Sequence, residues 1–589
     1  MKKNKKIILS LVLIGMITAG FVAISQHRQP DLIQTKDISS TQAIGGTPVG
    51  QDSGAQTQPE KKQAPLAHTQ TQPQDRHEPL TAPDSTPNSP DTPTVSKEYE
   101  YRALGPTPND PYAASAWLLQ KTGTVNAWEH TTGSQVVVAV IDTGFALQHE
   151  DLVNSWYHNP GETGVGTDGK DRATNGIDDD NNGYIDDWRG WNFYGRYQPT
   201  DNPCSQDGMG TYIANNNPQA GQSGDDILYQ EDRDCFGVDP GDPHAAVSHG
   251  TSAAGLTGAT TNNGLGIATA NWHTKIMPLQ VLGDDGSGWT SKIVAAVRYA
   301  VDNGAQVINM SLGGPELDPN LQEAIQYAYQ HNVVVVAAAG NCGTGNEAGC
   351  MPSKPGQMMY PALYPHVIAV GATDQNDNRA GFSSYGRGLD VVAPGYGTLV
   401  SPTINTTTSP YNYTTSYAGG LAGTSFASPV VASIASLIRS QRPASTVDDI
   451  VALINASARK PSGMNGALYT PQYGHGIIDA NTASAVASTL STSSAQPIYS
   501  QAGTHRTEHT FLRGDMVSSG CTAAYNSYCT IRFTEPATGF ERFLPYQATN
   551  ATGEASWRWN TDALDYGEWW GRAQSGTYVS ANDYLLFSK

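Results

Sequence analysis

Four polar residues stand where apolar runs end or begin, and together they could carry out acyl transfer. Asp142 follows the apolar run 136–141, and Asn341 follows another such run. His249 and Ser425 each open a segment rich in small and apolar residues, which predicts that both lie at the start of a helix. A hydroxyl at a helix N-terminus can attack a carbonyl when a histidine takes its proton and a carboxylate holds that histidine. Free helix N–H groups and the Asn341 amide could then stabilise the oxyanion.

Each of these residues also has an ordinary interpretation when it is taken alone. Asp142 could be a turn residue at a strand end, His249 a surface histidine, Ser425 a helix N-cap and Asn341 a turn residue after glycine. Their combination favours the catalytic interpretation, because all four fall at the ends of predicted elements in the order Asp, His, Ser. That chain order is one of those known for a catalytic triad.

The elements that must position these side chains are predicted by an alternation of short apolar runs and amphipathic segments. Buried strands are predicted at 136–141, 276–282, 307–310, 333–339, 367–370 and 391–393. Helices are predicted at 291–303, 321–331 and 426–442, and Pro429 is expected in the first turn of the last one. Continuous Val, Ala and Ile runs are typical of a parallel sheet that is covered on both faces. The sequence therefore predicts an α/β fold with a doubly wound parallel sheet, whose site lies at the carboxyl ends of the strands.

Five short motifs carry a resemblance to a known family. They are Val-Ile-Asp-Thr-Gly around Asp142, His-Gly-Thr at His249, Ser-Leu-Gly-Gly at Ser311–Gly314, Ala-Ala-Gly-Asn ending at Asn341 and Gly-Thr-Ser-Phe-Ala-Ser-Pro around Ser425. In this order they resemble the subtilisin-like serine proteases. The resemblance runs from about Pro108 to Ala485 and implies a serine endopeptidase with Asp142, His249 and Ser425 as its triad.

The resemblance also implies how a peptide substrate binds. Ser311, Leu312, Gly313 and Gly314 would pair with the substrate backbone as an added strand, a mode that favours broad specificity. Gly340 would also bind the substrate, and Met359 would lie at the base of the primary specificity pocket, where it predicts a preference for uncharged, medium-sized side chains.

Two features depart from the family pattern. Phe426 follows the nucleophile where many members carry methionine, so an oxidisable sulfur is missing there. The region before Tyr99 does not have the composition of a folded prodomain, and this puts activation by prodomain removal in doubt.

An acidic loop between 175 and 187 predicts a calcium site. Its spacing matches the start of an EF-hand-type loop, although Arg189 stands where the last glutamate would be. Oxygen ligands alone favour calcium over zinc, and a solvated acidic loop is the alternative. The expected ligands are Asp178, Asp180, Asn182, the Tyr184 carbonyl and Asp187 or its neighbour Asp186.

A second calcium site is implied by the resemblance alone. It would use the side chains of Asp151 and Asn263 and the carbonyls of Leu265 and Ile267.

Composition sets the remaining expectations. The 589 residues carry a formal net charge of −20, so a basic footprint for nucleic acid is missing. Lysines before the apolar stretch 7–24 predict a signal peptide over 1–25, with an uncleaved membrane anchor as the alternative; the rest of the chain is extracellular in either case. Residues 26–98 have the composition of a disordered linker, 99–490 form the predicted catalytic domain, and 496–589 predict a small Ig-like β-sandwich.

Six cysteines in an exported chain favour disulfides. Close spacing suggests the pairs Cys204–Cys235, Cys342–Cys350 and Cys521–Cys529, although six cysteines allow fifteen connectivities and buried free thiols are the alternative. The long interval between Asp142 and His249 would then be a disulfide-closed, calcium-bound excursion beside the cleft.

Two other functions remain open at this point. One is a processing peptidase of narrow specificity that uses the same residues. The other is a surface-binding protein with a degenerate protease domain, against which the complete triad argues. We expect a monomer that acts on protein or peptide substrates. The C-terminal region could dock on a surface or a substrate through Trp557, Trp559, Trp569 and Trp570, although these side chains could equally fill its core.

Overall fold

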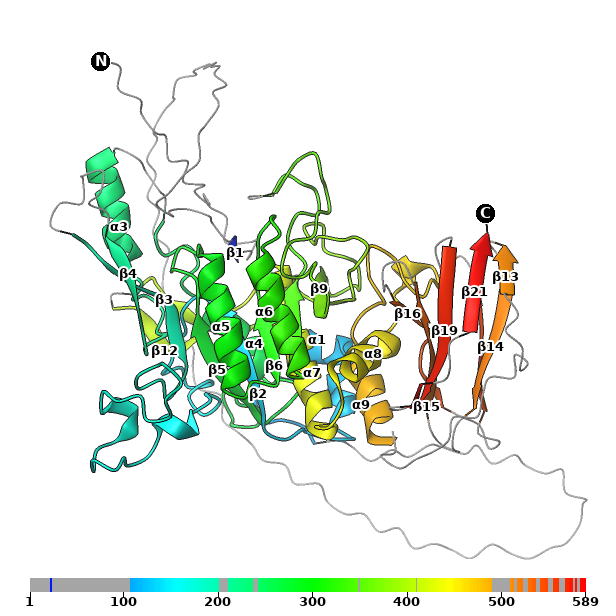
Figure 1. Cartoon of the computed structure of the whole chain (residues 1–589), viewed down its shortest axis with the longest axis horizontal. Helices are drawn as coiled ribbons and strands as arrows, with labels where there is room; N and C mark the ends of the chain where they lie inside the picture. Colours follow the sequence, from blue (N-terminus) through cyan, green and yellow to red (C-terminus); the bar gives the residue numbers. More distant parts are fainter. Residues whose placement is uncertain are drawn as a thin grey trace, which may run out of the picture. The chain divides into compact units, whose positions relative to one another are not determined.

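The computed structural model describes residues 106–200, 210–236, 242–347, 350–408 and 410–489 (Figure 1). It also describes short segments between 509 and 588 and a two-residue strand, β1 (Val22–Ala23). The predicted linker 26–98 and the signal cleavage site after residue 25 lie outside these residues, and both stay predictions.

An eight-stranded sheet forms the centre of the catalytic region. Its strand order is β10-β9-β8-β6-β2-β5-β3-β4, and every neighbouring pair is parallel except the edge pair β3–β4. The predicted α/β fold with a parallel sheet is confirmed. The strands are β2 (Val136–Asp142), β3 (Trp191–Gln198), β4 (Thr211–Asn215), β5 (Thr274–Gln280), β6 (Val307–Met310), β8 (Val334–Ala338), β9 (Val367–Thr373) and β10 (Val391–Pro394).

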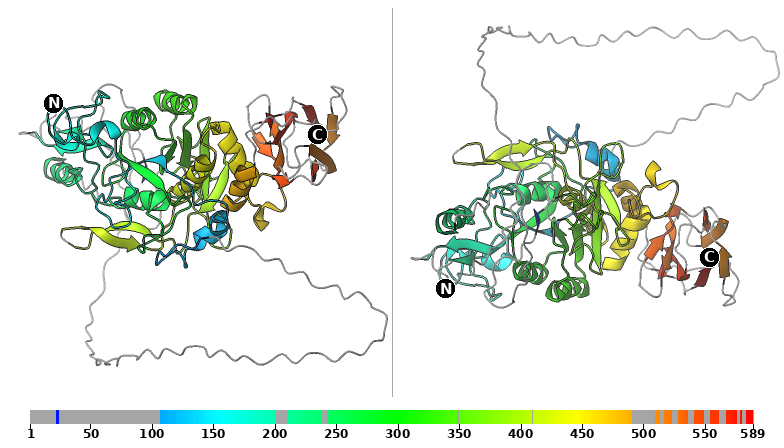
Figure 2. Two further views of the ribbon diagram at one scale, coloured as in Figure 1. Left: turned by 90° about the horizontal axis from the view of Figure 1, so that it is seen from below. Right: turned by 90° about the horizontal axis from the view of Figure 1, so that it is seen from above.

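Helices cover both faces of this sheet, which explains why its strands are apolar on both sides (Figures 1 and 2). In β2, Val138 and Val140 pack in one core together with residues of α4, α7, α8 and α9, whereas Ala139 and Ile141 pack in a second core with α5 and α6. The helices are α1 (Trp117–Lys121), α2 (Thr124–Ala127), α3 (Asp225–Glu231), α4 (His249–Gly258), α5 (Thr290–Asp302), α6 (Pro319–Gln330), α7 (Thr424–Gln441), α8 (Val447–Ser457) and α9 (Ala480–Thr489).

Local signals fix where the helices begin and end. Asp318 caps α6 by accepting hydrogen bonds from the N–H groups of Asn320 and Leu321, and Pro319 occupies the first helical position, where a missing N–H costs nothing. Helix α5 ends before Asn303 and Gly304, and Gly304 takes the positive φ of 82° that favours glycine.

The long interval between Asp142 and His249 forms an excursion at one edge of the sheet. It contains the short helical turn η1 (Pro160–Glu162), strands β3 and β4 and helix α3. Strand β3 joins the sheet through a parallel pairing of Trp191 and Asn192 with the end of β5. A second hairpin, β11 (Ser401–Asn405) with β12 (Asn412–Ala418), lies outside the main sheet.

The C-terminal region contains strands in two sheets. One has the order β13-β21-β19-β15-β16, with β17 and β20 attached, and the other pairs β14 with β18. The strands predicted at 529–533, 555–559 and 584–587 fall inside β15, β18 and β21, whereas the Ig-like sandwich itself stays a prediction. The strands are β13 (His509–Leu512), β14 (Met516–Thr522), β15 (Tyr528–Thr534), β16 (Glu541–Phe543), β17 (Gln547–Ala548), β18 (Glu554–Asn560), β19 (Gly567–Ser575), β20 (Tyr578–Val579) and β21 (Asp583–Ser588).

Of the three predicted cysteine pairs, Cys342 and Cys350 form a disulfide in the structure. Cys204 lies outside the described residues, and the side chains of Cys521 and Cys529 are not described, so those two pairs stay predictions. The side chains of the four C-terminal tryptophans are not described either, so their role in docking or in the core also stays a prediction.

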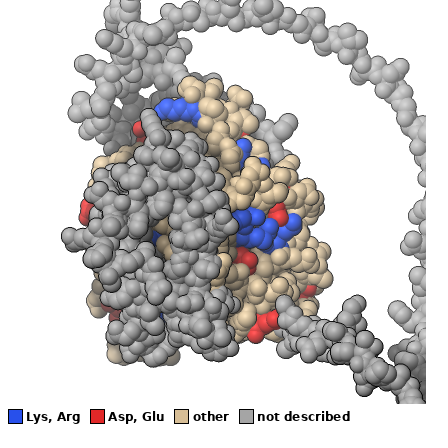
Figure 3. All heavy atoms as spheres, turned by 90° about the vertical axis from the view of Figure 1, so that its right-hand side faces the viewer, with Lys and Arg blue, Asp and Glu red and all other residues tan. Residues whose placement is uncertain are grey.

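No helix in the described part of the chain is long and apolar enough to cross a bilayer. Figure 3 shows one face of the molecule, on which the described Lys and Arg side chains lie among acidic and neutral ones.

Candidate active site

The structure brings Asp142 and His249 into direct contact. Asp142 is the last residue of β2, and His249 is the first residue of α4. The His249 Nδ1 atom lies 2.7 Å from Asp142 Oδ1, and the Thr143 N–H donates to the same oxygen, also at 2.7 Å. A carboxylate only accepts, so Nδ1 carries the proton and Nε2 is left as the basic atom. Both side chains are buried, which strengthens their interaction.

Ser425 is the second residue of α7, where the backbone N–H groups have no partner within the helix. Its Oγ atom is buried and accepts or donates no hydrogen bond within the described chain. The next side chain, Phe426, packs on the His249 ring at a centroid distance of 5.5 Å. The positive end of the helix dipole and the free N–H groups therefore surround a hydroxyl that is available for reaction.

Asn341 lies just beyond β8 with its amide oriented by a neighbour. Its Oδ1 atom accepts from the N–H of Thr424 at 3.0 Å and from the Thr424 hydroxyl at 3.1 Å. Its Nδ2 atom is buried and has no hydrogen-bond partner among the described residues. A buried amide without an acceptor is costly, unless a ligand such as an oxyanion supplies one. Thr424, which the sequence analysis did not single out, fixes this orientation.

Pro429 lies deeper in α7 than predicted. It is the sixth helical residue and not part of the first turn, because the helix already begins at Thr424. A proline there cannot donate to the carbonyl of Ser425, four residues earlier. The Ser311 hydroxyl donates to that carbonyl instead, at 2.8 Å, and is itself buried.

The predicted substrate-binding edge is a short buried strand, β7 (Leu312–Gly313), between Ser311 and Gly314. Gly314 exchanges two backbone hydrogen bonds with Tyr360, at 2.8 and 2.9 Å, which fixes the end of this edge. The backbone of β7 pairs in parallel with β1. An extended segment can therefore add to β7 by main-chain hydrogen bonds.

Gly340 and Met359 lie against each other, and the specificity pocket stays a prediction. The Met359 N–H donates to the Ala339 carbonyl at 2.9 Å, and its side chain is buried. A Cβ atom at Gly340 would lie 2.8 Å from Met359 Cγ, and the φ of Gly340 is +113°, so glycine is required here. Met359 also packs with the Cys342–Cys350 disulfide.

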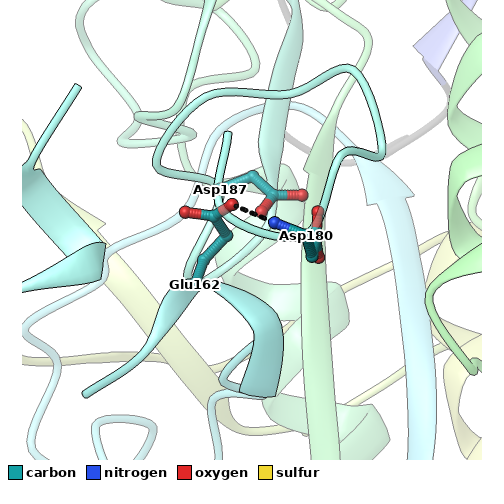
Figure 4. Close-up of side chains that lie close together, drawn as sticks. All are labelled: Glu162, Asp180 and Asp187. Carbon is teal, nitrogen blue, oxygen red and sulfur yellow. Dashed lines mark hydrogen bonds between the residues drawn. The ribbon is translucent and has the colours of Figure 1, made fainter. Parts of the chain in front are cut away.

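In the acidic loop, the structure gathers only part of the predicted ligand set. Ligand atoms of Asp180 and Asp187 lie within 4.8 Å of each other and of Glu162, a residue that the sequence analysis did not identify (Figure 4). Asp178 instead accepts from the N–H groups of Asn182 and Gly183, at 3.1 and 2.8 Å. The Asn182 side chain donates to Asp187 and Asp180, and the Tyr184 N–H donates to Asn182 Oδ1.

Three of the residues of the second predicted calcium site, Asn263, Leu265 and Ile267, lie close to Asp151, whereas the site itself stays a prediction. The Asp151 carboxylate is buried and accepts from Asn263 Nδ2 and from the N–H of Ile267, both at 3.0 Å. Leu265 contacts the site through its N–H, which donates to Asn263 Oδ1 at 2.7 Å. Burial, together with the nearby Asp110 and Glu150 carboxylates, raises the pKa of Asp151 to about 7. Asp110, which the sequence analysis did not single out, is buried and accepts from the backbone N–H groups of Asn262 and Asn263.

A nucleophilic hydroxyl at a helix N-terminus, a buried Asp–His pair and an unpartnered amide on a parallel α/β sheet define a serine hydrolase. Residues 133–476, more than half of the chain, match the model of the subtilase family. The chain belongs to this family and is a serine endopeptidase.

Relatives of known sequence support the assignment. The chain is 33% identical to thermitase from Thermoactinomyces vulgaris over 361 residues, which cover 61% of this chain and 93% of thermitase. It is 39% identical to subtilisin DY from Bacillus licheniformis over 235 residues, which cover 40% of this chain and 77% of subtilisin DY. Among solved structures, a protease from Pseudoalteromonas arctica is 29% identical with a TM-score of 0.46, covering 65% of this chain and all of that one.

Proposed function

We propose that Ser425, His249 and Asp142 cleave peptide bonds through an acyl-enzyme. The Ser425 Oγ atom bonds to the peptide carbonyl carbon while His249 Nε2 takes its proton. His249 then gives this proton to the leaving amine as the carbon–nitrogen bond breaks, and water reverses the sequence to release the acid. Asp142 holds the imidazole in the required tautomer and stabilises the imidazolium. The 2.7 Å contact between His249 and Asp142 is the observation that carries this proposal.

The negative oxygen that forms on the carbonyl is stabilised by two donors in this mechanism. They are Asn341 Nδ2, which has no partner among the described residues, and the N–H of Ser425 at the start of α7. Loss of one such donor typically costs on the order of 10²–10³ in rate.

Broad specificity is the second part of the proposal. Main-chain pairing along Leu312 and Gly313 reads no side chains, and Met359 offers an apolar wall that favours uncharged groups at the primary pocket. A profile of cleavage sites in unfolded proteins tests it: scattered cleavage supports broad specificity, and a single short consensus supports a processing peptidase.

Export and calcium stabilisation complete the proposal. Basic residues followed by the apolar stretch 7–24 support export to the cell exterior. Two observations support calcium: the buried Asp151 carboxylate beside Asp110 and Glu150, and the gathered acidic side chains of the loop. Calcium would hold Asp151 and Asn263 together and would hold the acidic loop in place. Unchanged thermal stability in EDTA would argue against a structural ion.

Labelling with a serine-reactive fluorophosphonate, read by intact mass, tests the catalytic assignment. One adduct is expected on the wild-type chain and none on Ser425→Ala. Ser440→Ala, which removes another hydroxyl of the same helix, is the matched control and should label normally. A folded wild-type chain that takes no label in calcium would contradict the proposal.

A further inference from the structure

A group of three carboxylates lies at the base of the excursion that precedes His249. Glu162 and Asp187 are fully buried, whereas Asp180 is exposed, and ligand atoms of all three lie within 4.8 Å of one another. Figure 4 shows their side chains converging from separate segments of the chain, with the Asp180 N–H bonded to Glu162. Three negative groups at this separation repel one another strongly in a buried setting.

Among the described residues, only one of the two Glu162 carboxylate oxygens has a hydrogen-bond partner. The Oε1 atom of Glu162 accepts from the N–H groups of Asp179 and Asp180, at 2.6 and 3.3 Å. Its Oε2 atom is buried and has no hydrogen-bond partner in the described part of the chain. A buried carboxylate oxygen is normally paired with a donor or with a metal ion.

No arginine or lysine of the described residues forms an ion pair with these three carboxylates; Arg172 pairs with the neighbouring Asp179, at 3.7 Å. The side chains that donate hydrogen bonds to Asp180 and Asp187 are neutral. Asn159 Nδ2 bridges Asp180 and Asp187 at 2.9 and 2.8 Å, and the Tyr299 hydroxyl donates to Asp187 at 2.6 Å. Neutral donors orient the oxygens without compensating their charge, which a bound cation would do.

The backbone at Gly161 leaves room for Asp180 to lie beside Glu162. A Cβ atom at Gly161 would lie only 2.4 Å from Asp180 Oδ2 and from Asp180 Cβ. The absent side chain therefore lets Asp180 reach its position beside Glu162, and any larger residue would displace it.

We infer that Glu162, Asp180 and Asp187 form a divalent-cation site with Glu162 as its buried ligand. The donor set contains only oxygen, which selects calcium over zinc or copper. This ligand set differs from the EF-hand-type set predicted from the sequence, because it recruits η1 and leaves Asp178 to cap the loop. The inference deepens the calcium part of the proposed function and is independent of the proteolytic part.

The ion would also connect the excursion to the main fold. Asp187 accepts from Tyr299 of α5, a helix that packs on the sheet, and Asn182 reaches Asn303 at the end of the same helix. A cation on Asp187 would thus fix the loop, η1 and α5 relative to one another.

Terbium titration of the full chain in a Ser425→Ala background tests the inference. Tyrosines next to the site, Tyr299 among them, can sensitise terbium emission, and calcium competition then reports the affinity for calcium. Glu162→Gln is expected to weaken binding at this site at least about tenfold, since even outer contacts of metal sites contribute 10–100-fold. Gly161→Ala should do the same without any change of charge.

Control variants separate this site from the others. Glu323→Gln removes an exposed carboxylate and should bind as the parent does. Asp151→Asn removes the other proposed calcium site and should leave the Glu162-dependent emission in place. If Glu162→Gln does not fold, Asp180→Asn on the exposed loop and Gly161→Ala decide the question.

Unchanged affinity in folded Glu162→Gln and Gly161→Ala would overturn the inference, even where calcium still binds at Asp151. A parent chain that binds neither terbium nor calcium would overturn both the inference and the calcium part of the proposed function. Fluorophosphonate labelling reports the catalytic assignment separately in either case.

Discussion

Ser311 has an unexpected position beneath the nucleophile, and a double-mutant cycle can measure what it contributes. The carbonyl of Ser425 would accept the N–H of residue 429 in an ordinary helix, but that residue is proline. The buried Ser311 hydroxyl donates in its place at 2.8 Å, and Asn309 Nδ2 in turn donates to Ser311 at 2.9 Å. Removing the Ser311 hydroxyl leaves a buried carbonyl without this donor, which costs about 1–3 kcal/mol.

The same reasoning predicts how the cost depends on Pro429. Alanine at 429 has an N–H that can reach the Ser425 carbonyl, so Ser311→Ala should cost less in a Pro429→Ala chain than in the parent. We expect a coupling free energy of about 1–2 kcal/mol, within the range seen for residues that share a partner. The intrinsic effect of removing the proline cancels in the cycle.

The assay is denaturant unfolding of the parent, the two single variants and the double variant at saturating calcium. A Ser425→Ala background prevents self-digestion and keeps the carbonyl. Ser440→Ala is the matched control, because its hydroxyl bonds the Leu437 carbonyl within the same helix and should show no coupling to residue 429. An equal cost of Ser311→Ala in both backgrounds would refute the idea that this hydroxyl replaces the missing helix bond.

Three further predictions follow from the site and its surroundings. Asn341→Leu removes the unpartnered amide and should lower kcat by about 10²–10³ with little change in KM, as measured on a peptide substrate; a rise in KM at constant kcat would contradict the oxyanion role. Met359→Ala should widen the primary pocket and raise kcat/KM for a large aromatic side chain relative to alanine, and an unchanged ratio would place Met359 outside the pocket. Burial, with Asp285 and Asp284 nearby, raises the pKa of Asp225 to about 7, so its stabilising protonated form is lost as pH rises through that value. The unfolding free energy of the parent should therefore fall relative to that of Asp225→Asn between pH 5 and pH 8, and a constant difference would contradict this.

The parts of the fold that could be predicted from the sequence are those in which a single local pattern determines the secondary structure. The run 307–310 became β6 without a shift, and the other Val- and Ala-rich runs became strands to within a few residues, because a strand buried on both faces leaves a continuous apolar signal. Strand β4 could not be found in this way, since Thr211–Asn215 mixes polar and apolar residues, and none of them is fully buried. It pairs with β3 at the sheet edge, and its Tyr212 ring packs on Tyr194 and Tyr197 of that strand.

The triad could be predicted because each residue stands at the end of an element with its own signal. Glu162 had no such signal: its partner Asp180 is 18 residues away, and their contact depends on how η1 folds against the loop. The role of Ser311 was likewise hidden, since its motif predicts substrate binding while its hydroxyl bonds to the Ser425 carbonyl. Which donor a buried carbonyl receives depends on tertiary packing and not on local sequence.

Two contacts of the excursion lie on the segment that follows β5. Asp187 accepts from Tyr299 in α5, and Asp225 accepts from the N–H of Asp284 at 2.9 Å in the loop between β5 and α5. The same loop begins with Val281, whose N–H donates to the carbonyl of Asp142 at 2.9 Å.

The segment from Val281 to Tyr299 thus contacts the backbone of the catalytic aspartate and two residues of the excursion. A cation bound at Glu162 would restrain that segment from the α5 side, and the Asp225 carboxyl, which accepts from Asp284, restrains it from the loop side. Because restraints of this kind act on position and not on chemistry, their loss should affect the alignment of Asp142 and His249 before it affects the reactivity of the Ser425 hydroxyl.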